Sequence, residues 1–229
     1  RQIRDFILED KLSNPINMPI ADMAQLKKIK PFLDLAETLG KIQSQLADYP
    51  IKSVAIECFG NIDDSKPIAL SFLIGLFNDI TDNRINFVNV AVIAEERGIS
   101  FAHSLNSESV SFSNLVMANV ITENGTIKVA GSVFGDQHPR IVDIMGYEVD
   151  VRPEGNMVFV QNKDVPGVIG KVGMVLGEGN VNIAEYLLSR TDNSDSAYSI
   201  IKVDGQINEK LLQTLSNIDE ILDIKQLYV

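Results

Sequence analysis

The stretch from Asn156 to Asn182 constrains the fold of this chain more than any other part. An apolar run at 157–160 predicts a strand, and Pro166 predicts the first turn of a helix, because proline has a fixed φ and no N–H to leave unpaired. Apolar residues then recur at helical spacing, which predicts one buried stripe. The stripe consists of Val168, Ile169, Val172, Val175 and Leu176. The stretch therefore predicts a strand and a helix that packs on a sheet, followed by a strand that begins near Val181.

The expected beginning of that helix predicts a site for a carboxylate or an amino acid. The first amides of a helix have no partner within it, and the positive end of the helix dipole favours an anion. Asn162, Asp164 and Asn182 offer hydrogen-bond donors and acceptors nearby, and Asp164 or its neighbour is expected to cap the helix. A second interpretation stays open, in which Asp164 is only a cap, Asn182 only a turn former, and Gly170 and Gly173 only close-packing points.

The sequence from Gly155 to Val229 resembles the ACT domain, a ligand-sensing module of amino-acid metabolism with a ferredoxin-like βαββαβ order. The resemblance is carried by D-x-P-G at 164–167, by the G-x-x-G that follows, and by V-N-I at 181–183. The remaining residues fit that order. They supply strands at 181–190 and 197–203, a turn at 192–195, a helix with Ile207, Leu211, Leu212 and Leu215, and a last strand that ends at Tyr228. We therefore expect an ACT domain over residues 154–229.

The ACT domains of 3-phosphoglycerate dehydrogenases bind serine across a dimer interface. The positions that match theirs here are Asn162 and Asp164 of one chain and Asn182 of the other. The resemblance implies that L-serine or another amino acid binds there, with its carboxylate on amides near Gly167 and Val168. It also implies that two chains pair through their ACT domains as a homodimer, and that the parent enzyme could form a tetramer.

Composition and charge exclude several classes of function. The chain has 31 acidic and 20 basic residues and a net charge of −11, which opposes binding to nucleic acid. No apolar run approaches the roughly 18–20 residues that span a bilayer, so no membrane partner is expected. With one cysteine and two histidines, the sequence predicts neither a metal site nor an iron–sulfur cluster. We expect Cys58 to be a buried apolar residue of a cytoplasmic protein, since a lone cysteine suits a reducing compartment.

The first residues differ in character from the rest. Residues 1–12 predict a short helix, and the two prolines within 14–19 predict an extended arm, because each proline disfavours the α region for the residue before it. This segment resembles the end of the nucleotide-binding domain in 3-phosphoglycerate dehydrogenases. The chain starts with Arg1 and has no signal-peptide profile, so we expect a fragment in which residues 1–25 are tail and linker.

The region 26–153 predicts an α+β domain in which helices cover one face of a mixed sheet. One helix is expected from Pro31 to about Asp48, and a second from Ile68 to Ile80 after capping residues at 63–67. Asn124-Gly125 between two β-prone runs is the strongest hairpin signal. The expected strands are 52–59, a short strand at 87–93 that passes into a helical turn closed by Gly98, and the hairpins 110–122 with 126–134 and 141–144 with 148–151.

This middle region resembles the intervening domain of the long 3-phosphoglycerate dehydrogenases. The matching residues include Leu39-Gly40, Asn86-x-Val88-Asn89, Arg97-Gly98-Ile99 and Gly131-Ser132-Val133-Phe134-Gly135. In some members of the family, basic residues that match Arg140 and Arg152 hold an anion, and His138 lies close in sequence. The alternative is that these arginines make only solvated ion pairs.

Together these resemblances imply the regulatory part of a 3-phosphoglycerate dehydrogenase, an NAD-dependent enzyme of serine synthesis. Neither a G-x-G-x-x-G loop nor an Arg, Glu and His catalytic set is recognisable, so we expect no catalytic residue and no cofactor site here, and NAD would belong to the parent enzyme. Two alternatives stay open. One is the non-catalytic subunit of an L-serine dehydratase, and the other is a structural oligomerisation module with an empty ACT pocket.

Overall fold

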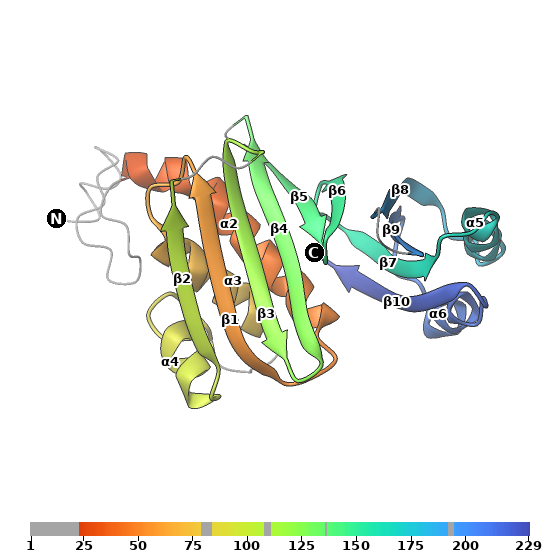
Figure 1. Cartoon of the computed structure of the whole chain (residues 1–229), viewed down its shortest axis with the longest axis horizontal. Coiled ribbons are helices and arrows are strands. Elements are labelled where there is room, and N and C mark those ends of the chain that lie inside the picture. Colours follow the sequence, from red (N-terminus) through yellow and green to blue (C-terminus); the bar gives the residue numbers. More distant parts are fainter. Residues whose placement is uncertain (1–22, 79–83, 108–110, 136, 192–194) are drawn as a thin grey trace. The chain divides into compact units, whose positions relative to one another are not determined.

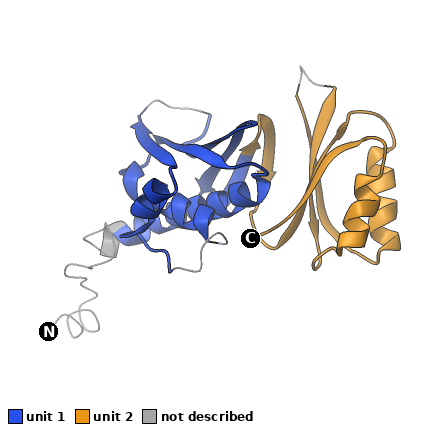
Figure 2. Ribbon diagram, turned by 90° about the horizontal axis from the view of Figure 1, so that it is seen from below, with its two compact units in different colours: residues 1–142 blue, residues 143–229 orange. Residues whose placement is uncertain are grey.

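The computed structural model describes residues 23–78, 84–107, 111–135, 137–191 and 195–229. The chain divides into two compact units, residues 1–142 and 143–229 (Figure 2). The helix and arm expected at 1–19, the residue Ile80 and most of the turn expected at 192–195 lie outside the described residues. Within the described part, no helix is long and apolar enough to cross a membrane.

Two long helices of the first unit follow the expected apolar stripes, with one correction. Helix α2, Met23–Leu46, begins well before Pro31, which lies inside it and not in its first turn. Proline removes one helical hydrogen bond, but Ile29 before it and Leu33 after it are both buried, so packing continues across the break. Helix α3, Ser65–Phe77, begins as expected, because the Asp64 carboxylate accepts the Lys66 amide at 2.9 Å.

Helix α4, Val90–Glu96, occupies most of the segment where a strand was expected. The strand prediction for 87–93 was wrong, because two asparagine side chains fold the chain before it into turns. The Asn86 carboxamide oxygen accepts the Val88 amide at 2.9 Å, and the Asn89 oxygen accepts the Asn86 amide at 2.8 Å. Such local bonds stabilise a turn over the β conformation that valine favours.

The expected mixed sheet is present, and all of its strands except the last begin in the first unit. Its strands are β1 Ile51–Gly60, β2 Ser100–Asn106, β3 Asn114–Thr122, β4 Gly125–Phe134, β5 His138–Ile144 and β6 Tyr147–Val151, in the order β2-β1-β3-β4-β5-β6. Strand β1 pairs with β2 in parallel and with β3 antiparallel, and the β3–β4 hairpin turns at Glu123-Asn124, where Gly125 pairs with Thr122 as the first residue of β4. Strand β2 was not expected from the sequence, because five of its seven residues are exposed and show no apolar alternation.

Helices α2 and α3 lie on one face of this sheet (Figure 1). Where they cross, a glycine of each helix lies against the backbone of the other helix. A Cβ on Gly40 of α2 would collide with the Phe72 carbonyl oxygen, and a Cβ on Gly75 of α3 would collide with the Glu37 carbonyl oxygen. Gly131 of β4 likewise makes room for the Leu35 side chain, since a Cβ there would lie 2.7 Å from a Leu35 methyl carbon. These contacts fix how closely the helices approach each other and the sheet.

The second unit confirms the ferredoxin-like order. Its elements are β7 Asn156–Lys163, α5 Val168–Glu178, β8 Ile183–Arg190, β9 Ser196–Val203, α6 Glu209–Ser216 and β10 Ile221–Tyr228. The four strands are ordered β10-β7-β9-β8 and every pair is antiparallel. Both helices cover one face of the sheet (Figure 1). Most of the expected α5 stripe is confirmed, since Val168, Val172 and Leu176 are buried and Val175 is partly buried. Ile169 is half exposed, so its assignment to the stripe was wrong.

The second compact unit begins at Asp143, ahead of the boundary expected at 154. The reason lies in the Tyr147 side chain. Its hydroxyl and the Ser196 hydroxyl share a hydrogen bond of 2.8 Å, and its ring stacks on Tyr198 with centroids 5.3 Å apart. Strand β6 therefore packs with the βαββαβ elements, although it ends the six-stranded sheet.

Candidate functional site

A pocket of about 400 Å³ lies at the N-terminal end of α5. Four of the five residues predicted to bind an effector line it, namely Asn162, Asp164, Gly167 and Val168. The remaining lining residues are Val165, Pro166, Ile169, Leu188 and Arg190. Leu188 and Arg190 were missed from the sequence. The sequence offered one signal for them, the strand expected at 181–190, because alternate residues at the end of a strand lie on the same face. No local pattern, however, shows that this strand lies beside the helix.

Asn162 forms the buried base of the pocket. Val158 and Val160 of β7 point into the core beneath the helices, and Asn162 continues the same alternation, with 2% of its surface exposed. Its Nδ2 atom donates to the Lys163 carbonyl at 2.7 Å, whereas its Oδ1 atom has no hydrogen-bond partner among the described residues. An unpaired buried polar atom costs about 1–3 kcal/mol, so this oxygen is suited to accept a bond from a ligand.

The beginning of α5 presents free amides, but not with the expected capping. Gly167 is the N-cap residue with φ 96°, a left-handed conformation that favours glycine, and no side chain caps the helix within the described residues. The capping role expected for Asp164 is therefore wrong, and Pro166 precedes the helix instead of starting its first turn. The first helical bond runs from the Lys171 amide to the Gly167 carbonyl at 3.0 Å, which leaves the amides of Val168 and Ile169 for a ligand.

Asp164 instead forms an ion pair within the pocket. Its Oδ2 atom lies 3.0 Å from the Nε atom of Arg190, and the Asp164 side chain is 28% exposed, against 66% for Arg190. The loop that carries Asp164 is fixed by its backbone, because the Asp164 amide donates to the Asp195 carbonyl at 2.8 Å. The pocket thus holds one carboxylate, one guanidinium, a buried amide oxygen and a helix N-terminus.

Asn182, the fifth predicted residue, lies outside this pocket in the same chain. It is exposed just before β8, and its Nδ2 atom donates to the Asp204 carboxylate at 2.7 Å. The sequence-based prediction places Asn182 in the pocket of a second copy. That placement stays a prediction.

Three titratable groups of the second unit, Tyr186, Tyr198 and Glu220, have shifted pKa values, and for both tyrosines the main cause is burial. Burial raises the pKa of Tyr186, which faces the core on β8. The hydrogen bond from Lys171, with Nζ 2.6 Å from Oε1, lowers the pKa of Glu220. In the first unit, burial raises the pKa of Cys58 to about 12, and the residue is part of the core as expected.

Comparison with known proteins decides the family. The profile of the D-3-phosphoglycerate dehydrogenase intervening domain matches residues 28–145, more than half of the chain. The chain belongs to the D-3-phosphoglycerate dehydrogenase family. It is 31% identical over 212 residues to D-3-phosphoglycerate dehydrogenase of Bacillus subtilis, and the matched residues make up 92% of this chain and 40% of that protein. It is 29% identical over 225 residues to the enzyme of that name from Methanocaldococcus jannaschii, covering 97% of this chain and 43% of the relative.

The chain thus spans about 40% of the length of these D-3-phosphoglycerate dehydrogenases. Among solved structures, the ACT domain from the GTP pyrophosphokinase of Chlorobium tepidum aligns with 32% of this chain and 97% of its own, at 12% identity and a TM-score of 0.27. The assignment of the βαββαβ unit rests on its own strand order and pairing, not on that similarity.

The residues predicted to form an anion site are divided between the two units. His138 is exposed and Arg140 half-buried on β5, in the first unit, whereas Arg152 follows β6 in the second. Arg152 Nη1 lies 3.7 Å from Glu154 Oε1, an exposed ion pair of the kind that contributes little. The anion site stays a prediction.

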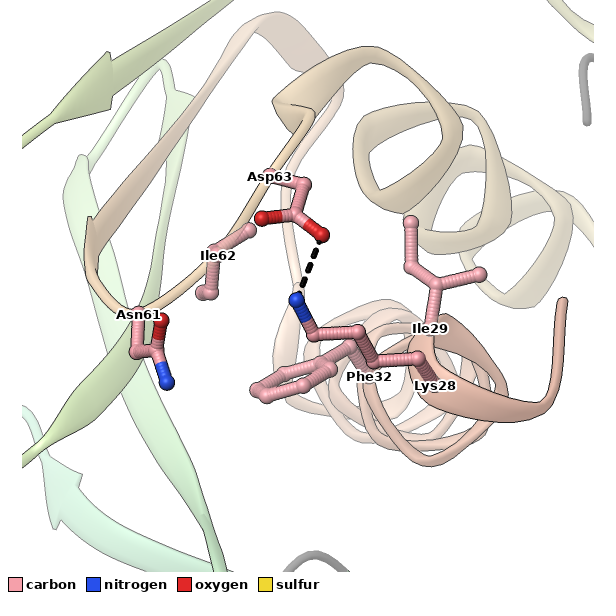
Figure 3. Close-up of a pocket in the computed structure, with 6 residues that line it drawn as sticks. All are labelled: Lys28, Ile29, Phe32, Asn61, Ile62 and Asp63. Atoms are coloured by element: carbon pink, nitrogen blue, oxygen red, sulfur yellow. Dashed lines mark hydrogen bonds and ion pairs between the residues drawn. The ribbon is translucent and has the colours of Figure 1, made fainter. Parts of the chain in front are cut away.

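A second pocket, at the beginning of α3, is too small for a metabolite (Figure 3). Its volume is about 20 Å³, close to the space of a single water molecule. The Lys28 ammonium and the Asp63 carboxylate are 2.7 Å apart beside it, while Ile29, Phe32 and Ile62 supply apolar walls (Figure 3). The described residues contain no group of three or more His, Cys, Asp or Glu side chains arranged to hold a metal ion.

Proposed function

We propose that this chain is the regulatory C-terminal part of a D-3-phosphoglycerate dehydrogenase and that its βαββαβ unit binds L-serine. The observation that carries the proposal is the unpaired Oδ1 atom of Asn162, which is almost fully buried at the base of a pocket. The pocket also contains an uncapped helix N-terminus and the Asp164 carboxylate. A ligand with a hydroxyl donor, a carboxylate and an ammonium group would complement all three features.

Each group of L-serine has a counterpart in this proposal. Its carboxylate takes the amides of Val168 and Ile169, where the helix dipole favours negative charge. Its ammonium group binds the Asp164 carboxylate, a charge-assisted bond. Its hydroxyl donates to the Asn162 Oδ1 atom and removes the cost of leaving that oxygen unpaired.

A second copy of the chain completes the proposed site. Strand β8 is an edge of the four-stranded sheet, and an edge strand leaves backbone groups available for pairing with another chain. Side-by-side pairing of two copies along this edge would bring Asn182 of one copy toward the pocket of the other. Serine binding would then favour one arrangement of the dimer, with a coupling of roughly 1–3 kcal/mol to the enzyme's activity if it is ordinary allostery.

The oxidation of 3-phosphoglycerate with NAD is proposed for the parent enzyme and not for these 229 residues. The sequence contains no dinucleotide-binding G-x-G-x-x-G loop at a strand-to-helix turn, and the relatives are more than twice as long. A dehydrogenase segment encoded upstream of Arg1 would agree with this proposal. A gene without one would favour the subunit of a serine dehydratase.

Calorimetric titration of the chain with L-serine tests the proposed site. We expect saturable binding, and we expect Asp164→Ala and Asn182→Ala each to weaken it about ten- to a hundredfold, the effect of losing a bond worth roughly 1.5–3 kcal/mol. Asp63→Ala is the matched control, because it breaks another exposed ion pair, that with Lys28, outside the pocket. Absence of binding at millimolar L-serine, in a chain that still dimerises, would contradict the proposal and favour the structural module.

A further inference from the structure

The Asp164–Arg190 ion pair occupies the carboxylate that a ligand ammonium would need. Arg190 is the last residue of β8 and pairs across the sheet with Ala197 of β9, which pairs in turn with Asn162 of β7. The three residues form one row across the sheet on the face that carries the helices. Ala197 is fully buried and is not among the residues that line the pocket, so Asn162 and Arg190 border the pocket from strands that lie two spacings apart, about 10 Å. The pocket of about 400 Å³ has room for a small amino acid.

We propose that Arg190 is a specificity-determining residue of this pocket, which admits ligands that carry both an ammonium and a carboxylate and rejects ligands that carry only one of them. The inference rests on the proposed amino-acid site. It adds Arg190, which the sequence analysis did not assign to that site, and a rule for which ligands bind there.

The rule follows from counting charges in the pocket. A ligand with only a positive charge must separate Arg190 from Asp164 and leaves the guanidinium without an anion. A ligand with only a negative charge competes with Asp164 for Arg190 and places a second negative charge beside the first. A zwitterion inserts between the two side chains, so that Asp164 receives the ammonium and Arg190 receives the carboxylate. Only the zwitterion replaces one ion pair with two.

The geometry of Arg190 suits this exchange. The ion pair uses its Nε atom, and its terminal nitrogens, which can grip a carboxylate in two places, make no hydrogen bond with the described residues. Its side chain is 66% exposed and therefore has room to move, whereas Asp164 is more enclosed and its loop is held at Asp195. Arg190 and the amides of Val168 and Ile169 lie around the same pocket, so they can share one carboxylate.

Three probes separate the two charges in calorimetric titrations of the chain. L-serine carries both charges, ethanolamine carries the amine and hydroxyl without the carboxylate, and glycerate carries the carboxylate and hydroxyl with a second hydroxyl in place of the amine. We expect the unaltered chain to bind L-serine at least tenfold more tightly than either of the others. We expect Arg190→Gln to weaken L-serine binding at least tenfold and to leave ethanolamine binding unchanged or stronger, because the competing cation is gone.

The decisive quantity is the ratio of L-serine affinity to ethanolamine affinity. It should fall at least tenfold in Arg190→Gln and recover in part in Arg190→Lys, which restores the charge. The matched control is Lys171→Gln, which breaks the 2.6 Å ion pair with Glu220 in the same unit and outside the pocket, and should keep the ratio unchanged. A general loss of folding would appear as a lowered unfolding temperature and would weaken all probes alike.

The outcomes also separate this inference from the proposed function. L-serine binding by the unaltered chain, together with an unchanged ratio in Arg190→Gln, would overturn the role of Arg190 and leave the serine site intact. If the unaltered chain binds no L-serine, the proposed function and this inference both fail.

Discussion

Glycines on the helices of the two units have opposite surroundings. On α3, a Cβ at Gly75 would collide with the backbone of α2 at Glu37, and Gly40 on α2 meets the backbone at Phe72 in the same way. On α5, a Cβ at Gly173 would meet nothing within 4 Å. The first unit therefore uses glycine to bring two helix backbones together, whereas α5 presents glycine to open space. Residue type alone does not distinguish a packing glycine from an exposed one.

Buried carboxamides show the same contrast. Gln43 of α2 is fully buried, and its Nε2 atom donates to the carbonyls of Ala118 on β3 and Ile127 on β4, at 3.0 and 2.7 Å. Asn162 is also buried, and the carboxamide oxygens of both side chains have no hydrogen-bond partner among the described residues, but only Asn162 lines the pocket at the beginning of α5. One side chain joins a helix to two strands, while the other keeps an acceptor for a ligand. The first unit is accordingly built around packing and the second around a site.

The largest effect should come from Gly75→Ala. The added methyl group meets backbone that cannot rotate away, so we expect the free energy of unfolding of the first unit to fall by more than about 3 kcal/mol, measured by urea denaturation. Gly173→Ala is the control: it adds the same methyl group to a helix in open space and should stabilise the second unit by about 0.5–1 kcal/mol. Equal effects of the two changes would break the comparison.

Gln43→Met should come next. Methionine keeps much of the volume but leaves the carbonyls of Ala118 and Ile127 without their donor, so we expect a loss of about 1–3 kcal/mol in denaturation experiments. Gln45→Met, at a half-buried position whose Nε2 atom donates to the Lys41 carbonyl of its own helix at 2.9 Å, should change stability by less than about 0.5 kcal/mol. A neutral Gln43→Met would show that this carboxamide does not tie the helix to the sheet.

Gly167→Ala should lower stability by about 1–2 kcal/mol, because an alanine there is forced into a left-handed conformation. It should also weaken L-serine binding in calorimetry, since Gly167 sets the direction of the first α5 amides. Gly205→Ala is the matched control, with φ 88° and open space but a position outside the pocket. It should show a similar stability loss without the binding loss. Equal binding losses would argue against a specific role of the Gly167 turn.

The smallest effect concerns the pH dependence of the second unit. The hydrogen bond from Lys171 lowers the pKa of Glu220 in the folded state from its ordinary value of 4.5. The bond therefore stabilises the fold at pH values above 4.5, and this contribution disappears as the pH falls through the lowered value. Lys171→Gln should be less stable than the unaltered chain at neutral pH and equal to it in strong acid. The control Lys210→Gln, on α6, should leave the curve of unfolding free energy against pH unchanged.

Local patterns predicted elements well where neighbouring residues decide them. The hairpin beside Asn124-Gly125, a helix cap within 63–67 and the α5 apolar stripe without Ile169 all appear where the sequence placed them. Prediction was wrong where two local preferences compete, as at 87–93, where asparagine turns prevail over valine. It also missed β2, an exposed edge strand held by parallel pairing with β1, because no periodic burial marks it.

The sequence by itself determined the βαββαβ order and brought Asn162, Asp164, Gly167 and Val168 together, since they lie within seven consecutive residues that join a strand to a helix. Only the tertiary structure decided that Arg190 joins them, that Asp164 pairs with it instead of capping α5, and that the Asn162 oxygen is left without a partner. The physical reason is the strand order β7-β9-β8. This order places the end of β8 two strands away from β7. Pairing between strands that are distant in sequence depends on the burial of both helices against the whole sheet, and no local spacing of residues encodes that burial.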